Sequence, residues 1–157
     1  MDAIVRQCAV IPYRLEPSLN VLLITSRETH RWIIPKGNVP ATRTPRDAAA
    51  HEAYEEAGIR GILDGTPIGF YTYEKVLKDG SRQPTMVEVF PLKVTKETKS
   101  WPEKKERQAR WVTPQEAAQL VLEPSLASLL LQLPEYLMRA SARPKDAFGT
   151  RLRDHRS

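Results

Sequence analysis

The chain is short of cysteine and of long apolar segments. Cys8 is the single cysteine, so an intramolecular disulfide is impossible and a zinc site built on a cysteine cluster is excluded. No apolar run approaches the roughly 20 residues that a membrane helix needs. The first ten residues lack the basic start and long apolar core of a signal peptide. The sequence therefore predicts a cytoplasmic protein without a membrane segment, in which Cys8 lies in a buried strand.

What the chain does have is an ordinary globular composition with an excess of positive charge. Its 157 residues are enough for one domain with a hydrophobic core and too few for two ordinary domains. Hydrophobic residues make up 41% and charged residues 27%, and the mean hydropathy is -0.45, as in soluble proteins. The net charge of +5 suits an anionic partner, and both a polyphosphate and a nucleic acid would qualify.

Helix signals are strongest between Thr44 and Gly58. Thr44 suits the N-cap, Pro45 suits the first helical position, and Gly58 is a left-handed stop. A second helix is predicted from Pro114, because residues 113–118 form a capping-box motif with proline at the first position. These two helices are the predicted covers of a sheet.

Strands are predicted by short apolar or alternating runs. The runs are at residues 6–13, 20–24, 32–34, 68–73 and 86–94. Turn signals at residues 16–18 and 78–81 predict two hairpins. Strands that bracket a helix argue for a mixed sheet with the second helix on its other face. The fold class is therefore α/β, with an α/β/α sandwich around a mixed central sheet.

Leucines are frequent in the C-terminal part of the chain, between Pro124 and Met138. They predict apolar helical turns interrupted by Pro134, which pack on the core; a homodimer surface is the alternative interpretation. Beyond residue 140 the chain is basic and poor in large apolar residues. We therefore expect a single domain over residues 1–140 and a basic peripheral tail over residues 141–157.

An acidic cluster stands out on the first predicted helix. Glu52, Glu55 and Glu56 fall within roughly 100° of one another on one helix face, while small alanines occupy another face that can pack on a sheet. Crowded carboxylates favour hard cations such as Mg²⁺ or Mn²⁺, which clamp phosphates and activate water. A solvated acidic face is the alternative interpretation of the same pattern.

The spacing around these glutamates resembles the signature of the Nudix hydrolase family. The signature's two glycines and three metal-binding glutamates have counterparts at the expected spacing: Gly37, Glu52, Glu55, Glu56 and Gly58. Residues 32–36 and 109–112 also look like that family, in particular its diphosphoinositol polyphosphate and diadenosine polyphosphate phosphohydrolase branch. The resemblance covers roughly residues 4–122. It implies the Nudix fold and a metal-dependent hydrolase that cleaves a diphosphate linkage in a polyphosphorylated small molecule.

The resemblance also implies a ligand set and a catalytic base. The metal ligands would be the Gly37 carbonyl with Glu52, Glu55 and Glu56, holding Mg²⁺ or Mn²⁺. Glu52 or Glu56 would take the proton of the attacking water. The catalytic residues predicted on this basis are Glu52, Glu56 and His51.

Two positions depart from the signature. Arg43 stands where the box has its first glutamate, and His51 stands where it has the arginine that precedes the first metal-binding glutamate. A histidine can reach Glu55 across one turn, at i, i+4, but it lacks the permanent charge and donor fork of arginine. We therefore expect a retuned enzyme. A catalytically weakened Nudix domain that acts as a ligand sensor is the alternative.

Basic residues at four separate places resemble the phosphate-binding positions of the phosphoinositol branch: Arg6, Arg27, Lys36 and Arg107. Arginine suits this task because its planar fork matches phosphate oxygens in pairs. Candidates for stacking a nucleobase are harder to place among the aromatic residues at 70, 71, 73 and 101. This combination favours an inositol pyrophosphate or a dinucleoside polyphosphate as substrate. An RNA 5'-pyrophosphohydrolase is the rival enzyme, with nucleic acid as its partner.

Overall fold

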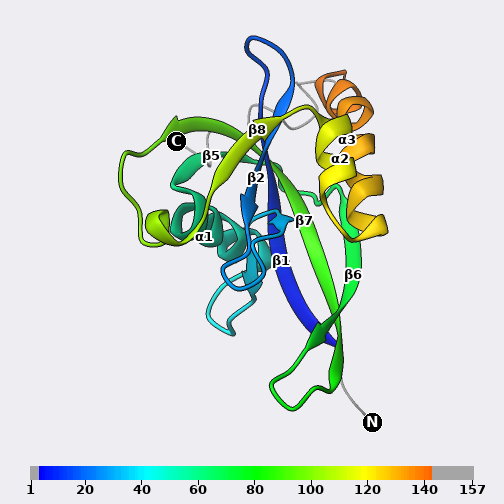
Figure 1. The fold of residues 1–157 in the computed structure, drawn as a ribbon. Coiled ribbons are helices and arrows are strands. Elements are labelled where there is room, and N and C mark those ends of the chain that lie inside the picture. The colour runs from blue at the N-terminus through cyan, green and yellow to red at the C-terminus, as the bar shows by residue number, and fades with distance from the viewer. Residues whose placement is uncertain (1–3, 143–157) are drawn as a thin grey trace.

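The computed structural model describes residues 4–142, which form a mixed sheet with helices on both faces (Figure 1). The strands are β1 (Val5–Arg14), β2 (Asn20–Thr25), β3 (Trp32–Ile33), β4 (Lys36–Asn38), β5 (Ile59–Leu63), β6 (Gly69–Val76), β7 (Arg82–Glu97) and β8 (Ala109–Val112). The helices are α1 (Pro45–Ala57), α2 (Pro114–Leu120) and α3 (Pro124–Ser141), with a 3₁₀ turn at Lys104–Glu106. The predicted α/β/α sandwich is confirmed.

The two long strands β1 and β7 run parallel at the centre of the sheet, with Val5 opposite Thr85 and Tyr13 opposite Lys93. The other pairs are antiparallel: β1 with β2 and β4, β7 with β5 and β6, and β2 with β3 and β8. Both predicted hairpins, β1–β2 and β6–β7, are therefore confirmed. The sequence patterns do not predict β4, β5 and β8, because these strands are short and owe their conformation to the strands beside them.

Helix α1 begins and ends at the predicted residues. The Thr44 side chain accepts a hydrogen bond of 3.1 Å from the Asp47 N–H, and Gly58 ends the helix with a φ of 68°. Alanines line the side of α1 that faces the sheet, and Ala49 and Ala53 are completely buried there. Small side chains thus bring α1 close to β1, and the helix presents its glutamates beside β4.

Helices α2 and α3 cover the opposite face of the sheet (Figure 1). Both hydrogen bonds of the predicted capping box at Thr113 and Glu116 are present. The predicted interruption at Pro134 is wrong, because α3 continues through it as one helix. The leucine row of α3 is buried on the sheet, at Leu126, Leu129, Leu130 and Leu133. Burial of this row offsets the hydrogen bond that a proline removes inside a helix.

Two hydrophobic cores result, one on each face of the sheet. The core under α2 and α3 includes Ile11 and Leu23, and the core under α1 includes Val10 and Phe90. Cys8 is completely buried in the α1 core, as predicted. Within residues 4–142, no helix is long and apolar enough to span a membrane. The predicted basic tail lies outside the described residues from position 143 onward.

Candidate active site

Glu56, on the last turn of α1, is a buried carboxyl group with few protein partners. Only 6% of the residue is exposed. Its Oε1 accepts a hydrogen bond of 3.2 Å from the backbone N–H of Lys36, and its Oε2 lies 3.8 Å from the Arg107 guanidinium. Burial, followed by a hydrogen bond with the Glu52 carboxyl, raises the pKa of Glu56 to about 8, against the opposing effect of Arg107.

Glu52 lies one helical turn before Glu56 and packs against Gly37 of β4. A Cβ added to Gly37 would lie 2.4 Å from the Glu52 Cδ and 2.6 Å from its Oε2. The Gly37 carbonyl, in turn, accepts a hydrogen bond from the Cys8 thiol at 3.7 Å. Glycine is thus required at position 37 for close approach. The structure brings Gly37, Glu52 and Glu56 together, and their role as metal ligands stays a prediction.

The donors of this group fit a hard divalent cation. Two carboxylates and a backbone carbonyl are oxygen ligands, and Mg²⁺ is typically held by one or two carboxylates while it keeps waters or substrate phosphates. The Glu52 carboxyl group adds to the effect of burial in raising the pKa of Glu56, as expected for two carboxyl groups close together, and a cation between them would relieve that crowding. In residues 4–142, however, no set of three or more His, Cys, Asp or Glu side chains forms a ready metal cluster.

Glu55, the third predicted ligand, has a different partner. Its Oε2 lies 3.8 Å from His51 Nε2, and both side chains are partly exposed. The i, i+4 contact between His51 and Glu55 is therefore confirmed, while the role of Glu55 as a metal ligand stays a prediction. Arg43, at the other departure from the signature, is exposed in the turn before α1.

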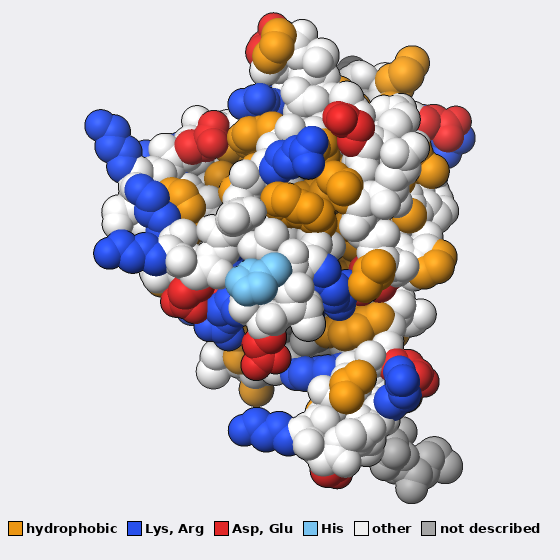
Figure 2. Space-filling view, in the orientation of Figure 1, with side chains coloured by type: hydrophobic (Ala, Val, Ile, Leu, Met, Phe, Trp, Pro, Cys, Tyr) orange, Lys and Arg blue, Asp and Glu red, His pale blue; other side chains and the backbone are white. Residues whose placement is uncertain are grey.

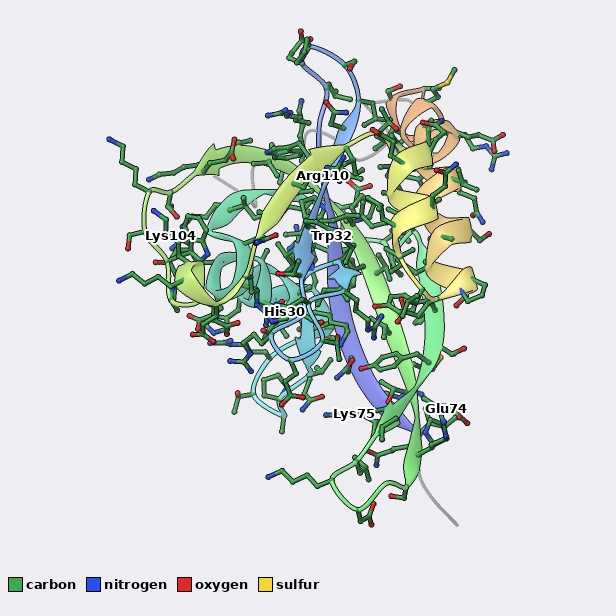
Figure 3. All side chains as sticks on the ribbon, viewed as in Figure 1. His30, Trp32, Glu74, Lys75, Lys104 and Arg110 are labelled. Carbon is green, nitrogen blue, oxygen red and sulfur yellow. The ribbon has the colours of Figure 1, made fainter. Side chains whose placement is uncertain are left out.

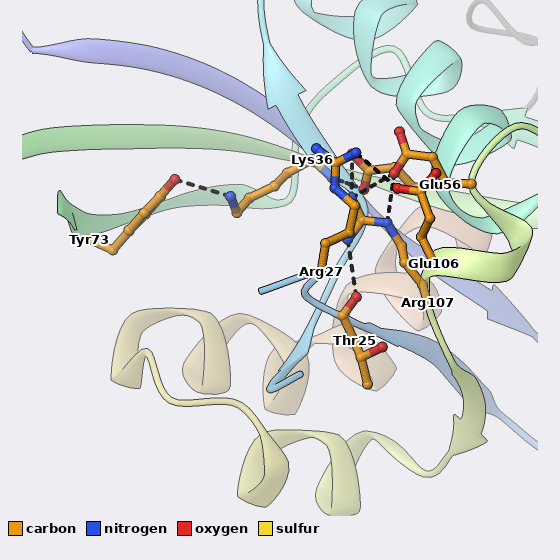
Figure 4. Close-up of polar contacts among 8 residues, drawn as sticks. Thr25, Arg27, Lys36, Glu56, Tyr73, Glu106 and Arg107 are labelled. Atoms are coloured by element: carbon orange, nitrogen blue, oxygen red, sulfur yellow. Dashed lines mark hydrogen bonds and ion pairs between the residues drawn. The ribbon is translucent and has the colours of Figure 1, made fainter. Parts of the chain in front are cut away.

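Arg107 is the buried cation of the site. Only 8% of its side chain is exposed. Its Nε donates to Glu103 Oε1 at 2.9 Å, and its Nη1 donates to the Thr25 carbonyl at 3.1 Å. Its Nη2 lies 2.8 Å from Glu103 and 3.8 Å from Glu56. Figure 4 shows Arg107 between Thr25 and Glu56, so its guanidinium is engaged with the protein, and the substrate-binding role predicted for it stays a prediction.

The segment that carries Arg107 is fastened to the C-terminal end of α1. The N–H and the hydroxyl of Thr98 both donate to the Gly58 carbonyl at 2.9 Å, and the Glu103 N–H donates to the Glu55 carbonyl at 3.0 Å. The Trp101 ring lies against Gly58, where a Cβ would come within 2.3 Å of it. Residues 98–107 therefore hold the glutamate-bearing end of α1 in place.

A cleft of about 750 Å³ opens beside Glu56. Five basic residues line it, namely Arg27, Arg31, Lys36, Lys75 and Arg107, against three acidic ones, Glu28, Glu56 and Glu74. Figure 3 shows Glu74 and Lys75 on the β6–β7 hairpin, which forms one wall. Lys and Arg side chains are also spread over the face in Figure 2, with acidic ones among them.

Three of the four predicted phosphate-binding residues reach this cleft. Arg27 is exposed and pairs with Glu106 at 3.1 Å, and Lys36 and Arg107 lie deeper. Arg6 is elsewhere: it is exposed and lines a separate cavity of about 90 Å³ with Phe70. The structure therefore does not bring Arg6 into one group with the other three.

A chain of hydrogen bonds fixes the Lys36 ammonium in the cleft. Lys36 Nζ donates to the Tyr73 hydroxyl at 3.1 Å, Tyr73 donates to Gln7 Oε1 at 2.8 Å, and Gln7 donates to Asn38 at 3.0 Å. The same ammonium lies 4.9 Å from the centre of the Tyr73 ring. Sequence patterns give no signal for this chain, because its members come from three strands that are distant in sequence.

The other aromatic candidates lie away from the cleft lining. Tyr71 is a core residue, with 2% exposed, and its ring centre lies 6.3 Å from that of Tyr73. Phe70 lines the separate cavity, and Trp101 packs on Gly58. Tyr73 therefore is the one of the four candidates that faces the cleft, and the Lys36 ammonium lies over its ring.

Glu103 is a partly buried carboxylate in the loop that carries Arg107. Its side chain is 20% exposed and holds Arg107 through two contacts. The available signal was the i, i+4 spacing of Glu103 and Arg107, which is typical of an ion pair within a turn.

Comparison with known proteins finds the NUDIX domain over residues 5–133. Nudix hydrolase 12, mitochondrial, from Arabidopsis thaliana is 38% identical over 105 residues, which cover 65% of this chain and 52% of that protein. The chain thus spans about half the length of this relative. Diphosphoinositol polyphosphate phosphohydrolase 2 of Rattus norvegicus is 40% identical over 67 residues, covering 42% of this chain and 37% of that protein. The crystal structure of C. elegans Ap4A hydrolase has the same fold, with a TM-score of 0.64 at 21% identity, covering 86% of this chain and 99% of that one.

Proposed function

The chain belongs to the Nudix hydrolase family, and on this basis we propose that it is a Mg²⁺- or Mn²⁺-dependent pyrophosphohydrolase of polyphosphorylated small molecules. The observation that carries the proposal is the position of Glu56. Its carboxyl group lines the same cleft as five basic residues. Carboxylates that hold a divalent cation and bases that bind phosphate are the two requirements of metal-assisted phosphate hydrolysis, and here the Glu56 carboxyl group shares one cleft with such bases.

The roles of the residues follow from their positions. Glu52, Glu56 and the Gly37 carbonyl would hold the metal, and Glu55 would join them from the exposed side of α1, where it contacts His51. When bound there, a divalent cation would supply charge for the phosphate oxygens and acidify a water molecule. Glu52 or Glu56 accepts the proton of that water as its oxygen bonds to phosphorus and the bridging P–O bond breaks. Lys36 and Arg27 bind the phosphate oxygens and stabilise the leaving phosphate.

The cleft favours an inositol pyrophosphate over a dinucleoside polyphosphate. A nucleobase needs an aromatic face on which to stack, and the ring of Tyr73 already has the Lys36 ammonium over it. The basic residues of the cleft other than Arg107, which is engaged with the protein, suit a ligand that carries phosphates on several sides. The local similarity to the rat diphosphoinositol polyphosphate phosphohydrolase supports the same choice.

Three further expectations belong to this proposal. RNA with a 5'-triphosphate is the second-choice substrate, supported by the net charge of +5. The cytoplasm is the expected location, although Nudix hydrolase 12 of Arabidopsis is named as mitochondrial. A homodimer stays the alternative interpretation of the α3 leucines that are not buried on the sheet, of which Leu131 is 53% exposed.

The test is Mg²⁺-dependent phosphate release over a panel of diphosphoinositol polyphosphate, diadenosine polyphosphates, ADP-ribose, nucleoside triphosphates and 5'-triphosphorylated RNA. Wild type is compared with Glu56→Gln and with Glu135→Gln, an exposed glutamate of α3 that serves as matched control. We expect chelation and Glu56→Gln to abolish release, and Glu135→Gln to leave it intact. Release that survives Glu56→Gln would place the reaction elsewhere, and binding without turnover of any compound would identify a ligand sensor.

A further inference from the structure

The sequence leaves Glu56 without the arginine that the family signature provides on the same helix. His51 occupies that position, is exposed and contacts Glu55, not Glu56. Glu56 is buried, and a buried carboxylate is costly unless a cation lies beside it. Besides the hydrogen bond from the Lys36 N–H, the Glu56 carboxyl group therefore needs a cationic partner, and Arg107 lies 3.8 Å from it.

Arg107 has the geometry of that group. Each of its three nitrogens faces a protein acceptor: Nε faces Glu103, Nη1 faces the Thr25 carbonyl, and Nη2 faces both Glu103 and Glu56. With 8% of the side chain exposed, the guanidinium has little surface left for a ligand. Arginine's rigid fork holds several acceptors in fixed directions at once, which a lysine ammonium does not do.

The anchors of Arg107 are themselves fixed. Thr25 ends β2, and its N–H and hydroxyl bond to the carbonyl and N–H of Gln108 at 3.0 and 2.8 Å. Glu103 is attached to α1 by the hydrogen bond from its backbone N–H to the Glu55 carbonyl. Arg107 therefore connects a strand end, a loop and the metal-binding face of α1.

We propose that Arg107 is a positioning residue, which holds the Glu56 carboxylate in place for metal binding. The inference rests on the proposed function, because it assigns Arg107 to the proposed metal site. It differs from the substrate-binding role predicted from the sequence. A positioning residue affects metal binding already in the substrate-free protein, whereas a substrate-binding arginine affects only the complex of the protein with its substrate.

The experiment compares four variants of the full chain. Arg107→Met removes the fork at similar length, and Arg107→Lys keeps only the charge. Arg27→Met removes an exposed cation of the same cleft. Arg46→Met is the structural control, because Arg46 donates to the backbone carbonyls of residues 63 and 64 at 2.9 and 3.2 Å, away from the glutamates. The readouts are kcat, KM and the rise in melting temperature that Mg²⁺ causes in the substrate-free protein.

We expect Arg107→Met to lower kcat roughly 10- to 100-fold with KM within about twofold of wild type. The Mg²⁺-induced rise in melting temperature should shrink in this variant, and Arg107→Lys should not restore either quantity. Arg27→Met should raise KM and keep the Mg²⁺ effect. Arg46→Met should keep both kcat and the Mg²⁺ effect even where it lowers the melting temperature.

Three results would overturn the inference. The first is an Arg107→Met protein with raised KM but unchanged kcat and Mg²⁺ effect, which would make Arg107 a substrate cation. The second is full recovery by Arg107→Lys. The third concerns Glu103→Gln, which removes a partner of Arg107 and is measured if Arg107→Met does not fold. We expect Glu103→Gln to lower kcat, and an unchanged kcat would refute the inference. A wild type without turnover and without a Mg²⁺ effect would instead refute the proposed function itself.

Discussion

Replacement of Gly37 by alanine should abolish most activity without unfolding the protein. The added Cβ would lie 2.4 Å from the Glu52 Cδ, while ordinary van der Waals contact begins at 3.4 Å. The carboxyl group must therefore move by about 1.0 Å. Misplacement of a catalytic group by 1 Å costs on the order of 10²-fold in rate. We therefore expect kcat/KM to fall about 100-fold.

Stability should change little in the same variant. The alanine clashes with the end of a flexible, partly exposed side chain and not with backbone, and Gly37 does not adopt a positive φ. We expect the free energy of unfolding to stay within roughly 1 kcal/mol of wild type, as for other substitutions that avoid the core.

The assay pairs phosphate release with thermal unfolding. Gly65→Ala is the matched control, because its Cβ would meet no atom within 4 Å. Activity within twofold of Gly65→Ala would refute the reasoning, because Glu52 would then not need its present position. A large fall in thermal stability that accompanies the loss of activity would refute it as well, because the substitution would then have damaged the fold and not only the site.

Three other perturbations test separate features. The pKa of Glu56 is raised from 4.5 to about 8, so between these pH values the folded metal-free protein binds a proton that the unfolded chain has lost. The free energy of unfolding should therefore fall as the pH rises from 4.5 to 8. Urea titrations should show a flatter pH dependence for Glu56→Gln. Gly58→Ala combines a φ of 68° with a clash against Trp101, so it should lower the free energy of unfolding by more than the roughly 1–3 kcal/mol of backbone strain alone. Gly80→Ala, which has a φ of 87° and open space around the added Cβ, should show only the loss due to backbone strain in the same unfolding assay. Tyr73→Phe removes the hydroxyl that holds the cleft lysine and should raise KM a few-fold with kcat nearly unchanged, and a kcat effect without a KM effect would contradict this role.

The parts of the fold that the sequence predicts are those that depend on local chemistry. Thr44 and Gly58 bound α1 because a cap and a left-handed glycine act within one turn. The same is true of the capping box at Thr113 and of the two hairpins. Pro134 shows the limit of such local rules, because burial of the leucine row keeps α3 continuous through it.

The candidate site also has parts that local sequence patterns predict and parts that depend on tertiary packing. Helical periodicity places Glu52 and Glu56 on one face, and the structure adds that Glu56 is buried and bonded to the backbone of Lys36. The i, i+4 spacing of Glu103 and Arg107 indicates their ion pair, but no local pattern indicates that Arg107 is buried, because burial of a charge depends on what packs over it. The separation of Arg6 from the other cations has a similar cause, since it follows from which side of β1 the residue faces.

The parallel pairing of β1 with β7 also governs when the protein can fold during its synthesis. Each pair in that ladder joins residues 80 positions apart, as Val5 and Thr85 show. The ribosome therefore completes β1, β2 and α1 before it makes the strand on which the centre of the sheet depends. Closing so long a loop is costly in entropy and slow. A nascent chain that ends before β7 carries the glutamates of α1 without the strand that supports β1 and β4 beside them, so the proposed metal site should form only late in translation.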